Sequence, residues 1–346
     1  MNIVYTSSNA YSKCTGISLF SLLYNNRDID DLDIYILTTD MDEMNKQKIS
    51  SMCLEFGRRV FIIDVSPTLQ AAQQKLNLAS YRGGLNTYAR AMANQILPTS
   101  LKDALFIDSD TLVCSSLVNI YDCVNDDKVL YGVEEIMLLI KGLCREDKDL
   151  FDSCQHYLNC GILFIDLEKW RELSGDEMIA TCVKSYGRQF KVAEQSILNY
   201  TFNKYIGLLP PKYNYYTVLH GINYNTISKR YKKRRIFTKE QIDDAKQSPV
   251  IIHFVGDHWI RPWYQDNDCY YRILYYNYYK KSPWGDKKLD EAPSYSTLFK
   301  LYFRFLRIIK KIGNGGMYFR FRYVFMEWMH EHFPKIEKLR EIDKRM

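Results

Sequence analysis

The chain has 346 residues, of which 47% are hydrophobic and 25% are charged, and its formal net charge is +6. This balance excludes a disordered chain, and the length fits one large α/β domain with an appendage or two modest domains. The nine cysteines never form a Cys-x-x-Cys pair, so neither a disulfide framework nor a zinc cage is indicated, and a reducing cytosol fits. Met1 leads directly into a short apolar segment, with no basic leader and no bilayer-spanning apolar run, which predicts a cytoplasmic protein without a signal peptide.

The positive charge is concentrated near the C-terminus. Residues 281–346 contain 15 Lys and Arg against 8 Asp and Glu, so the first 280 residues are close to neutral. Such an excess says little about the fold, but it predicts that the C-terminal region faces an anionic surface.

Short apolar segments alternate with longer amphipathic ones through roughly the first 200 residues. We expect strands at residues 2–5, 32–37, 59–65, 105–108, 128–133 and 161–166. Helical patterns cover residues 16–24, 41–56, 85–97 and 168–186. This alternation predicts βαβ units and therefore an α/β fold, a mostly parallel sheet with helices on both faces.

The turn after the first predicted strand contains no glycine. A nucleotide-binding sheet usually places a glycine-rich loop there, whose backbone amides surround the phosphates. The turn reads Thr6-Ser7-Ser8-Asn9-Ala10-Tyr11, and the next glycine is Gly16. If a diphosphate binds beside this turn, its main counter-charge must therefore come from elsewhere, and a metal ion is the economical source.

The sequence Asp108-Ser109-Asp110 ends an apolar run of strand length. Two carboxylates at the end of a buried strand are costly unless a charged group meets them, and the carboxyl edge of an open α/β sheet is where ligands bind. Hard oxygen ligands at this place indicate a divalent cation that could neutralise a diphosphate. The same three residues are also ordinary turn composition, and the motif alone does not decide between the two interpretations.

Three further segments carry polar groups at the ends of apolar ones. Asn159 and Gly161 precede a predicted strand, where glycine permits close approach and asparagine can bind sugar hydroxyls, although an ordinary turn fits equally well. His253 follows the late apolar segment 249–252 and is either a core residue or a ligand of a Mn²⁺-like ion. Arg261, next to Pro262-Trp263, is the kind of cation that binds phosphate.

The C-terminal third differs from the rest of the chain in composition and pattern. The basic run 229–235 is typical of a solvated face, and residues 282–293 have the composition of a linker. After it, a basic stripe and an apolar stripe recur side by side at helical spacing: Lys300, Arg304, Arg307 and Lys311 beside Leu301, Phe305, Ile308 and Ile312. The helix is either docked on the domain or bound to an anionic membrane surface, and we favour the membrane because apolar area and positive charge coincide.

Taken together, these segments resemble glycosyltransferase family 8, which includes glycogenins and bacterial lipopolysaccharide galactosyl- and glucosyltransferases. The resemblance covers about residues 1–263 in order and spacing. It rests on the segments Tyr88-Ala89-Arg90, Asp108-Ser109-Asp110, Asn159-Cys160-Gly161, Glu194-Gln195-Ser196-Ile197-Leu198-Asn199 and His253-x-x-Gly256 with Arg261-Pro262-Trp263.

The resemblance implies a GT-A, Rossmann-like catalytic domain, which we place at residues 1–281. The charge and the amphipathic pattern described above predict that a helical membrane-association region follows at 282–346. It implies transfer of galactose or glucose from a UDP-sugar, with retention at the anomeric carbon and usually with Mn²⁺, although Mg²⁺ is an alternative. The expected acceptor is a cell-surface glycan or a lipid-linked saccharide, and the expected location is the inner face of the cytoplasmic membrane.

The resemblance also implies roles for individual residues. Asp108, Asp110 and His253 would hold the metal, with Asp108 also near the ribose. Donor-binding residues would include Thr6, Ser8, Asn9, Tyr11, Ser109, Gly256 and Arg261, with Tyr11 stacked on uracil and the last two on the diphosphate. Arg90, Asn159, Glu194 and Gln195 would surround the donor sugar as the catalytic set.

This chain departs from the family pattern in three places. Ser8 stands near the position of an aspartate that can accept a hydrogen bond from uracil. The late motif usually reads Gly-x-x-Lys-Pro-Trp, whereas here the stretch from Gly256 to Arg261 is two residues longer and ends in arginine. Glu194 replaces the more usual aspartate.

Other interpretations compete with the transferase. Asp108-x-Asp110 also resembles the nucleophile motif of haloacid-dehalogenase-type phosphatases, but there it follows the first strand of the domain. A degenerate sugar-nucleotide domain acting as a membrane scaffold is a second alternative, favoured by Ser8 and the longer late loop. A self-glucosylating protein is compatible with the 28 tyrosines. Nucleic acid is not an expected partner, because no known module surrounds the basic run.

Overall fold

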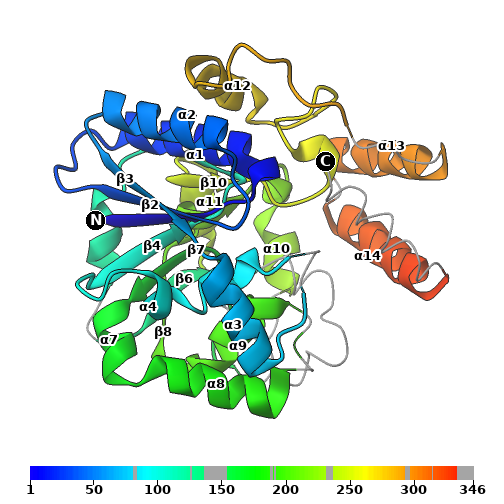
Figure 1. Ribbon diagram of the computed structural model, residues 1–346. Helices are drawn as coiled ribbons and strands as arrows, with labels where there is room; N and C mark the ends of the chain where they lie inside the picture. The colour runs from blue at the N-terminus through cyan, green and yellow to red at the C-terminus, as the bar shows by residue number, and fades with distance from the viewer. Residues whose placement is uncertain are drawn as a thin grey trace.

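The computed structural model describes residues 1–80, 84–124, 127–135, 154–187, 190, 192–230, 237–292, 297–313 and 315–332. Within them, a seven-stranded sheet has the strand order β3-β2-β1-β4-β7-β6-β8 (Figure 1). Its strands are β1 (Asn2–Thr6), β2 (Asp33–Thr38), β3 (Arg59–Asp64), β4 (Asp103–Ile107), β6 (Leu130–Glu134), β7 (Leu158–Asp166) and β8 (Ile206–Leu208). Only β7 runs against its neighbours, so the predicted α/β fold with a mostly parallel sheet is confirmed.

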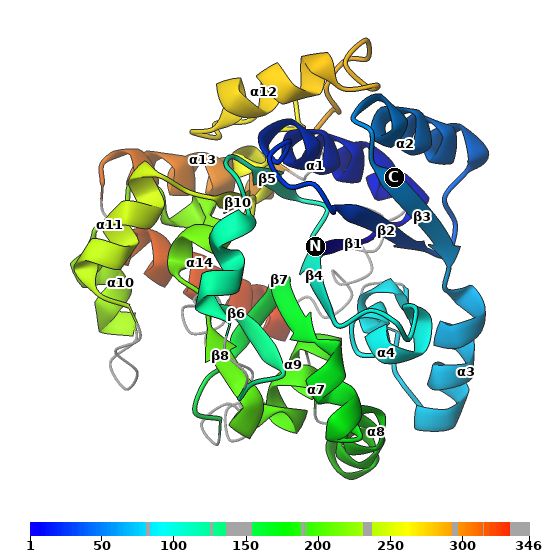
Figure 2. The same ribbon diagram turned by 90° about the vertical axis from the view of Figure 1, so that its left-hand side faces the viewer.

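Helices cover both faces of this sheet, because its strands are apolar on both sides. In β1, Ile3 and Tyr5 join one hydrophobic cluster, whereas Val4 between them joins the other. On the first face lie α1 (Ser12–Asn25) and α2 (Glu43–Glu55), with α12 (Arg272–Lys281) beyond them (Figures 1 and 2). On the second face lie α3 (Ser66–Leu76), α4 (Ala93–Ile96), α7 (Leu167–Glu172), α8 (Gly175–Tyr186) and α9 (Ala193–Thr201).

Two predicted helices differ from the structure. Residues 85–97 form a 3-10 turn, Asn86–Ala89, and the short α4 instead of one helix. Residues 168–186 form two helices, because Ser174 adopts a left-handed conformation (φ 54°) and the chain turns tightly around Trp170. The helix α3 was not predicted, since only Leu69 and Ala72 of its residues are buried and its apolar periodicity is weak.

A second, three-stranded sheet lies beside the first. It consists of β5 (Thr111–Val113), β10 (Ile251–His253) and β9 (Tyr215–Tyr216), in the order β5-β10-β9. The strand β5 follows β4 after a turn of three residues, so the small sheet is tied to the carboxyl edge of the large one (Figure 2). Two helices lie near it, α10 (Tyr224–Arg230) and α11 (Lys239–Gln247), whereas residues 231–235 of the basic run lie outside the described residues.

The stretch predicted as a linker is packed in its described part, residues 282–292. Trp284 is only 2% exposed and lies against Gly16 in α1, and its indole N–H donates to Asn45 Oδ1 at 3.2 Å. Asp290 forms an ion pair with Lys13. The stretch therefore holds the end of α12 to the first helices of the domain.

Two C-terminal helices follow, α13 (Thr297–Lys311) and α14 (Gly315–His332). Their buried residues Leu306, Ile309, Tyr318 and Phe319 join a third hydrophobic cluster with residues of α10, α11 and the loop after β10. Among the described residues, no helix combines the length and apolar character needed to cross a membrane. The predicted C-terminal helices are thus present, and one of their faces is docked on the domain.

We predict that Trp284→Ala destabilises the whole domain, since a buried tryptophan truncated to alanine costs about 3 to 5 kcal/mol of unfolding free energy. Ile273→Ala on the exposed face of α12 is the control and should leave stability nearly unchanged. Thermal unfolding followed by circular dichroism measures both variants. An unchanged midpoint for Trp284→Ala would mean that residues 282–292 are a linker after all.

Candidate active site

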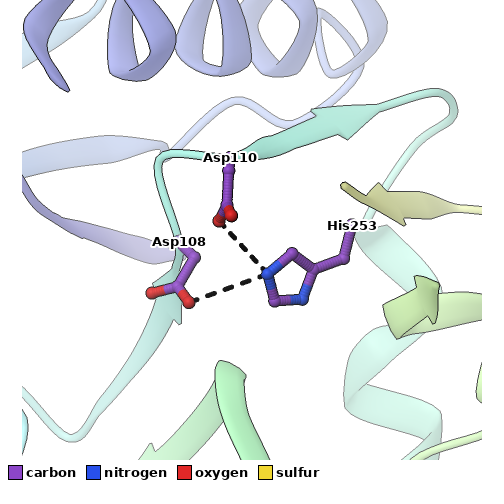
Figure 3. A group of neighbouring side chains, drawn as sticks. All are labelled: Asp108, Asp110 and His253. Atoms are coloured by element: carbon purple, nitrogen blue, oxygen red, sulfur yellow. Dashed lines mark hydrogen bonds and ion pairs between the residues drawn. The ribbon is translucent and has the colours of Figure 1, made fainter. Parts of the chain in front are cut away.

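Asp108, Asp110 and His253 come together at the edge between the two sheets (Figure 3). The first two lie in the turn between β4 and β5, where the Asp108 amide donates to the Gly161 carbonyl at 2.7 Å. His253 ends β10 and lies opposite Thr111 in the antiparallel pairing with β5. Its Nε2 is consequently 3.2 Å from Asp110 Oδ1 and 3.8 Å from Asp108 Oδ2.

This group fits a divalent cation. One ligand atom from each of the three side chains lies within 4.8 Å of the others, and both carboxylates are partly exposed while His253 is buried. Two carboxylate oxygens and an imidazole nitrogen suit Mn²⁺-like ions, as the sequence predicts. The His253 ring is held from behind, because Asn214 Oδ1 lies 2.9 Å from its Nδ1 and leaves Nε2 facing the carboxylates.

The charges of the group depend on one another. Burial alone would raise the pKa of Asp110. The charges of His253 and, next, of Arg261 lower it by more than burial raises it, so the pKa of Asp110 is lowered to about 2. For His253, burial lowers the pKa, and the Asp110 carboxylate more than offsets this, so its pKa is raised. Arg261 therefore lies close enough to add positive charge beside the Asp110 carboxylate.

Because Gly161 has no side chain, the His253, Asp108 and Asn159 side chains can occupy the space beside it. A Cβ atom there would lie 2.4 Å from His253 Cε1 and 2.8 Å from both Asp108 Oδ2 and Asn159 Oδ1. Real Cβ atoms do not approach this closely, so any larger residue displaces the ligand side chains. The close approach suggested by the sequence is thus between Gly161 and the site itself.

Arg90 supports the site from the opposite side. The 3-10 turn Asn86–Ala89 delivers it into the interior, where it forms ion pairs with Asp108 and with Glu194 in α9, the latter at 3.2 Å. Burial alone would lower the pKa of Arg90, but Asp108 and Glu194 raise it. Burial raises the pKa of Glu194, and Arg90 opposes this. A buried charge needs such partners, so the three residues form one unit.

Asn159 and Gln195 lie on the far side of the group. Asn159 donates from Nδ2 to Glu135 Oε2 at 2.7 Å and accepts from Asn214 Nδ2 at 2.9 Å. Gln195 Oε1 accepts the Cys160 amide at 3.1 Å. Sequence reasoning missed Glu135 and Asn214. Glu135 offered a signal, because it follows a buried strand as Asp108 does, whereas Asn214 lies in an irregular tyrosine-rich loop with no such pattern.

The predicted donor-binding residues around the first turn are only partly available to a ligand. Tyr11 is 44% exposed, and the Arg261 charge acts on it, so these two lie near each other. Asn9 Oδ1 already accepts from the Asp42 amide at 3.1 Å and from Asn45 at 3.0 Å. Ser109 Oγ is bonded to Thr15 Oγ1 at 2.7 Å and donates to the Thr6 carbonyl at 3.2 Å. Ser8 lies directly before Asn9, and its carbonyl accepts the Tyr11 amide at 3.0 Å.

The loop from Gly256 to Arg261 completes the site. Gly256 has a φ of 140°, a conformation that favours glycine, and a Cβ there would meet Ile260. The next residues form a 3-10 turn, His258–Ile260, and the guanidinium carbon of Arg261 lies 5.6 Å from the centre of the Trp263 ring.

The family model described as Glycosyl transferase family 8 matches residues 2–267. The chain belongs to this family. It is therefore a glycosyltransferase, which takes a sugar from a nucleotide-sugar donor and passes it to a glycan acceptor. The predicted membership and the GT-A fold are confirmed.

Among its relatives is the lipopolysaccharide 1,2-glucosyltransferase of Escherichia coli K12, 24% identical over 316 residues that cover 87% of this chain and 84% of the relative. General stress protein A of Bacillus subtilis is 22% identical over 82% of this chain and 95% of its own length. A crystal structure of the galactosyltransferase LgtC, in complex with donor and acceptor sugar analogues, has a TM-score of 0.65 at 17% identity, over 87% of this chain and 99% of that one. These structural likenesses concern the fold alone.

We predict that Gly161→Ala weakens Mn²⁺ binding at least about tenfold, the loss typical when groups that orient metal ligands are disturbed. Isothermal calorimetry with Mn²⁺ measures the change. Gly84→Ala is the matched control, because a Cβ there meets nothing within 4 Å. Equal Mn²⁺ affinity in the two variants would contradict the close approach described above.

Proposed function

We propose that this glycosyltransferase moves galactose or glucose from a UDP-sugar to a cell-surface glycan or lipid-linked saccharide, with retention and with Mn²⁺. The observation that carries the proposal is the group Asp108, Asp110 and His253, with Arg261 beside it. Mg²⁺ is the alternative ion, because two of the three ligands are carboxylates.

Departure of UDP is the step that needs help, because it leaves negative charge on the β-phosphate oxygen. A cation bound by Asp108, Asp110 and His253 would supply positive charge to the diphosphate. Arg261 would add a second, fixed charge there, and Gly256 would let the backbone approach the same phosphates. At the other end of the donor, exposed Tyr11 would stack on uracil.

The donor sugar would lie among Asn159, Glu194 and Gln195. All three side chains already have partners. Glu194 pairs with Arg90, Gln195 Oε1 accepts the Cys160 amide, and Asn159 is hydrogen-bonded to Glu135 and Asn214. An amide oxygen held by a backbone N–H is a poor nucleophile, which supports a front-face reaction over a covalent intermediate on Gln195. In that reaction the bond from the anomeric carbon to the β-phosphate oxygen breaks, the acceptor oxygen bonds to the same carbon face, and the acceptor proton passes to the departing phosphate.

We predict that the wild-type protein slowly releases UDP from one sugar of a panel of UDP-hexoses, with Mn²⁺ present and no acceptor added. Asp110→Ala should reduce this hydrolysis at least about a hundredfold, since the loss of a charged ligand removes transition-state stabilisation. Release of UDP, measured by a coupled assay with and without chelator, reports the reaction.

Asp31→Ala, an exposed aspartate at the amino edge of the sheet, is the control and should behave as wild type. Binding of UDP without hydrolysis would mean that the acceptor is required. Absence of both binding and hydrolysis for every UDP-sugar would refute the proposed donor class, and phosphate release from a phosphomonoester would favour the phosphatase.

We also propose that the C-terminal helices attach the protein to the inner face of the cytoplasmic membrane. Their outer face is apolar although it is exposed to solvent. Leu301, Phe305 and Ile308 of α13, Ile312 directly after it, and Met317, Phe321 and Val324 of α14 are all exposed. The rings of Phe305 and Phe321 are 5.1 Å apart, so the two sets adjoin. Exposed Lys300, Arg304 and Lys311 border this outer face, which is the composition that anionic lipid surfaces bind.

We predict that replacing Leu301, Ile308 and Ile312 together by serine releases the protein from vesicles containing anionic lipid, without changing UDP binding. Co-sedimentation measures the bound fraction, and Leu54→Ser with Ile273→Ser is the matched exposed control. These substitutions are sharper than deletion of residues 298–346. The deletion would also remove Leu306, Ile309 and Tyr318 from the core. Undiminished sedimentation of the triple variant would overturn the membrane proposal.

A further inference from the structure

The docked face of α13 and α14 contacts the four residues that separate Gly256 from Arg261. This is the stretch that is two residues longer than the family pattern. Asp257, His258 and Trp259 contact the C-terminal helices directly, and Ile260 belongs to the same hydrophobic cluster as residues of α13.

Asp257 makes the strongest of these contacts. Arg322 of α14 binds its carboxylate through two nitrogens, Nε to both oxygens at 3.1 Å and one Nη to Oδ1 at 2.9 Å. The Tyr318 hydroxyl donates to Oδ2 at 3.0 Å. Both side chains of the ion pair are only 11% exposed, and such a two-point guanidinium–carboxylate contact fixes position as well as charge.

The other residues between Gly256 and Arg261 pack with α13. The Arg307 guanidinium and the Lys310 ammonium each lie 5.5 Å from the centre of the buried Trp259 ring. The rings of His258 and Phe303 are 4.9 Å apart. Ile260 belongs to the same hydrophobic cluster as Leu306 and Ile309.

We propose that α13 and α14 form a brace that holds the loop 256–261 in the shape that presents Gly256 and Arg261 to the donor diphosphate. Asp257 and Arg322 are its positioning residues. The inference rests on the proposed function, in which this loop contacts the diphosphate of UDP. Because the outer face of the same two helices carries the exposed apolar residues, the brace links the proposed membrane surface directly to the donor site.

The brace predicts a selective loss of affinity. UDP and UMP share the base and the ribose, but only UDP carries the β-phosphate that the loop would contact. Loosening the loop should weaken UDP binding and spare most UMP binding, whereas general damage to the fold weakens both. The ratio of the two dissociation constants therefore separates a positioning role from a merely structural one.

The test is calorimetric titration of UDP and of UMP at saturating Mn²⁺, with wild type, Asp257→Asn and Arg322→Gln. We expect the dissociation constant for UDP to rise about tenfold in each variant, within the range for coupling through packed contacts, and that for UMP to change less than about twofold. Arg320→Gln, exposed on the same helix, is the matched control and should change neither.

Arg322→Lys keeps the charge but loses the two-point contact, and it decides the question should the other variants fail to fold. An unchanged ratio of UDP to UMP affinity in a folded variant overturns the brace and leaves the proposed function standing. Failure of wild type to bind UDP at all refutes the proposed function instead, and the brace falls with it.

Discussion

The structure depends on the compensation of two carboxylates at the carboxyl edge of β4. Asp108 and Asp110 would be unfavourable there without positive partners, because the surrounding strands are buried. Three distant segments supply those partners: Arg90 from the turn before α4, His253 from β10, and Arg261 from the loop after it. The small sheet determines one of these contacts, since the pairing of β10 with β5 fixes the position of His253. Three segments that are distant in the sequence therefore bring positive charge to the same two carboxylates.

The same constraint explains where sequence reasoning succeeded. The buried strands are short apolar runs, and the two aspartates end one of them, so six of the seven strands of the large sheet and the candidate pair Asp108 and Asp110 could be predicted from local pattern. Local pattern left His253 open between a core residue and a ligand, and the family resemblance favoured the ligand. The family resemblance added Arg90, Glu194 and Gln195 by their motifs. The region 85–97 was misjudged as a helix because its apolar residues are regularly spaced, whereas the structure uses them to bury a charged side chain, Arg90.

What could not be predicted depends on contacts between distant segments. Asn214 has no recognisable pattern in the sequence, and its role follows only from its position behind His253. Residues 282–293 are rich in proline, glycine and charge, yet one tryptophan, Trp284, fixes the described part to α1. The exposed and buried faces of α13 both contain apolar residues, so periodicity alone could not decide between a docked helix and a surface helix. The helix is docked on one face, and its other apolar face is open.

Two of the three departures from the family pattern lie at contacts that the structure shows. Glu194 is one methylene longer than the usual aspartate, and it forms an ion pair with the Arg90 guanidinium, which also pairs with Asp108. The longer stretch between Gly256 and Arg261 is occupied by residues that face the C-terminal helices. These two departures therefore lie in contacts around the group Asp108, Asp110 and His253 and not among the three metal-ligand candidates themselves. In such a network each charge is shared among several neighbours, so the contribution of one residue depends on whether the others are present.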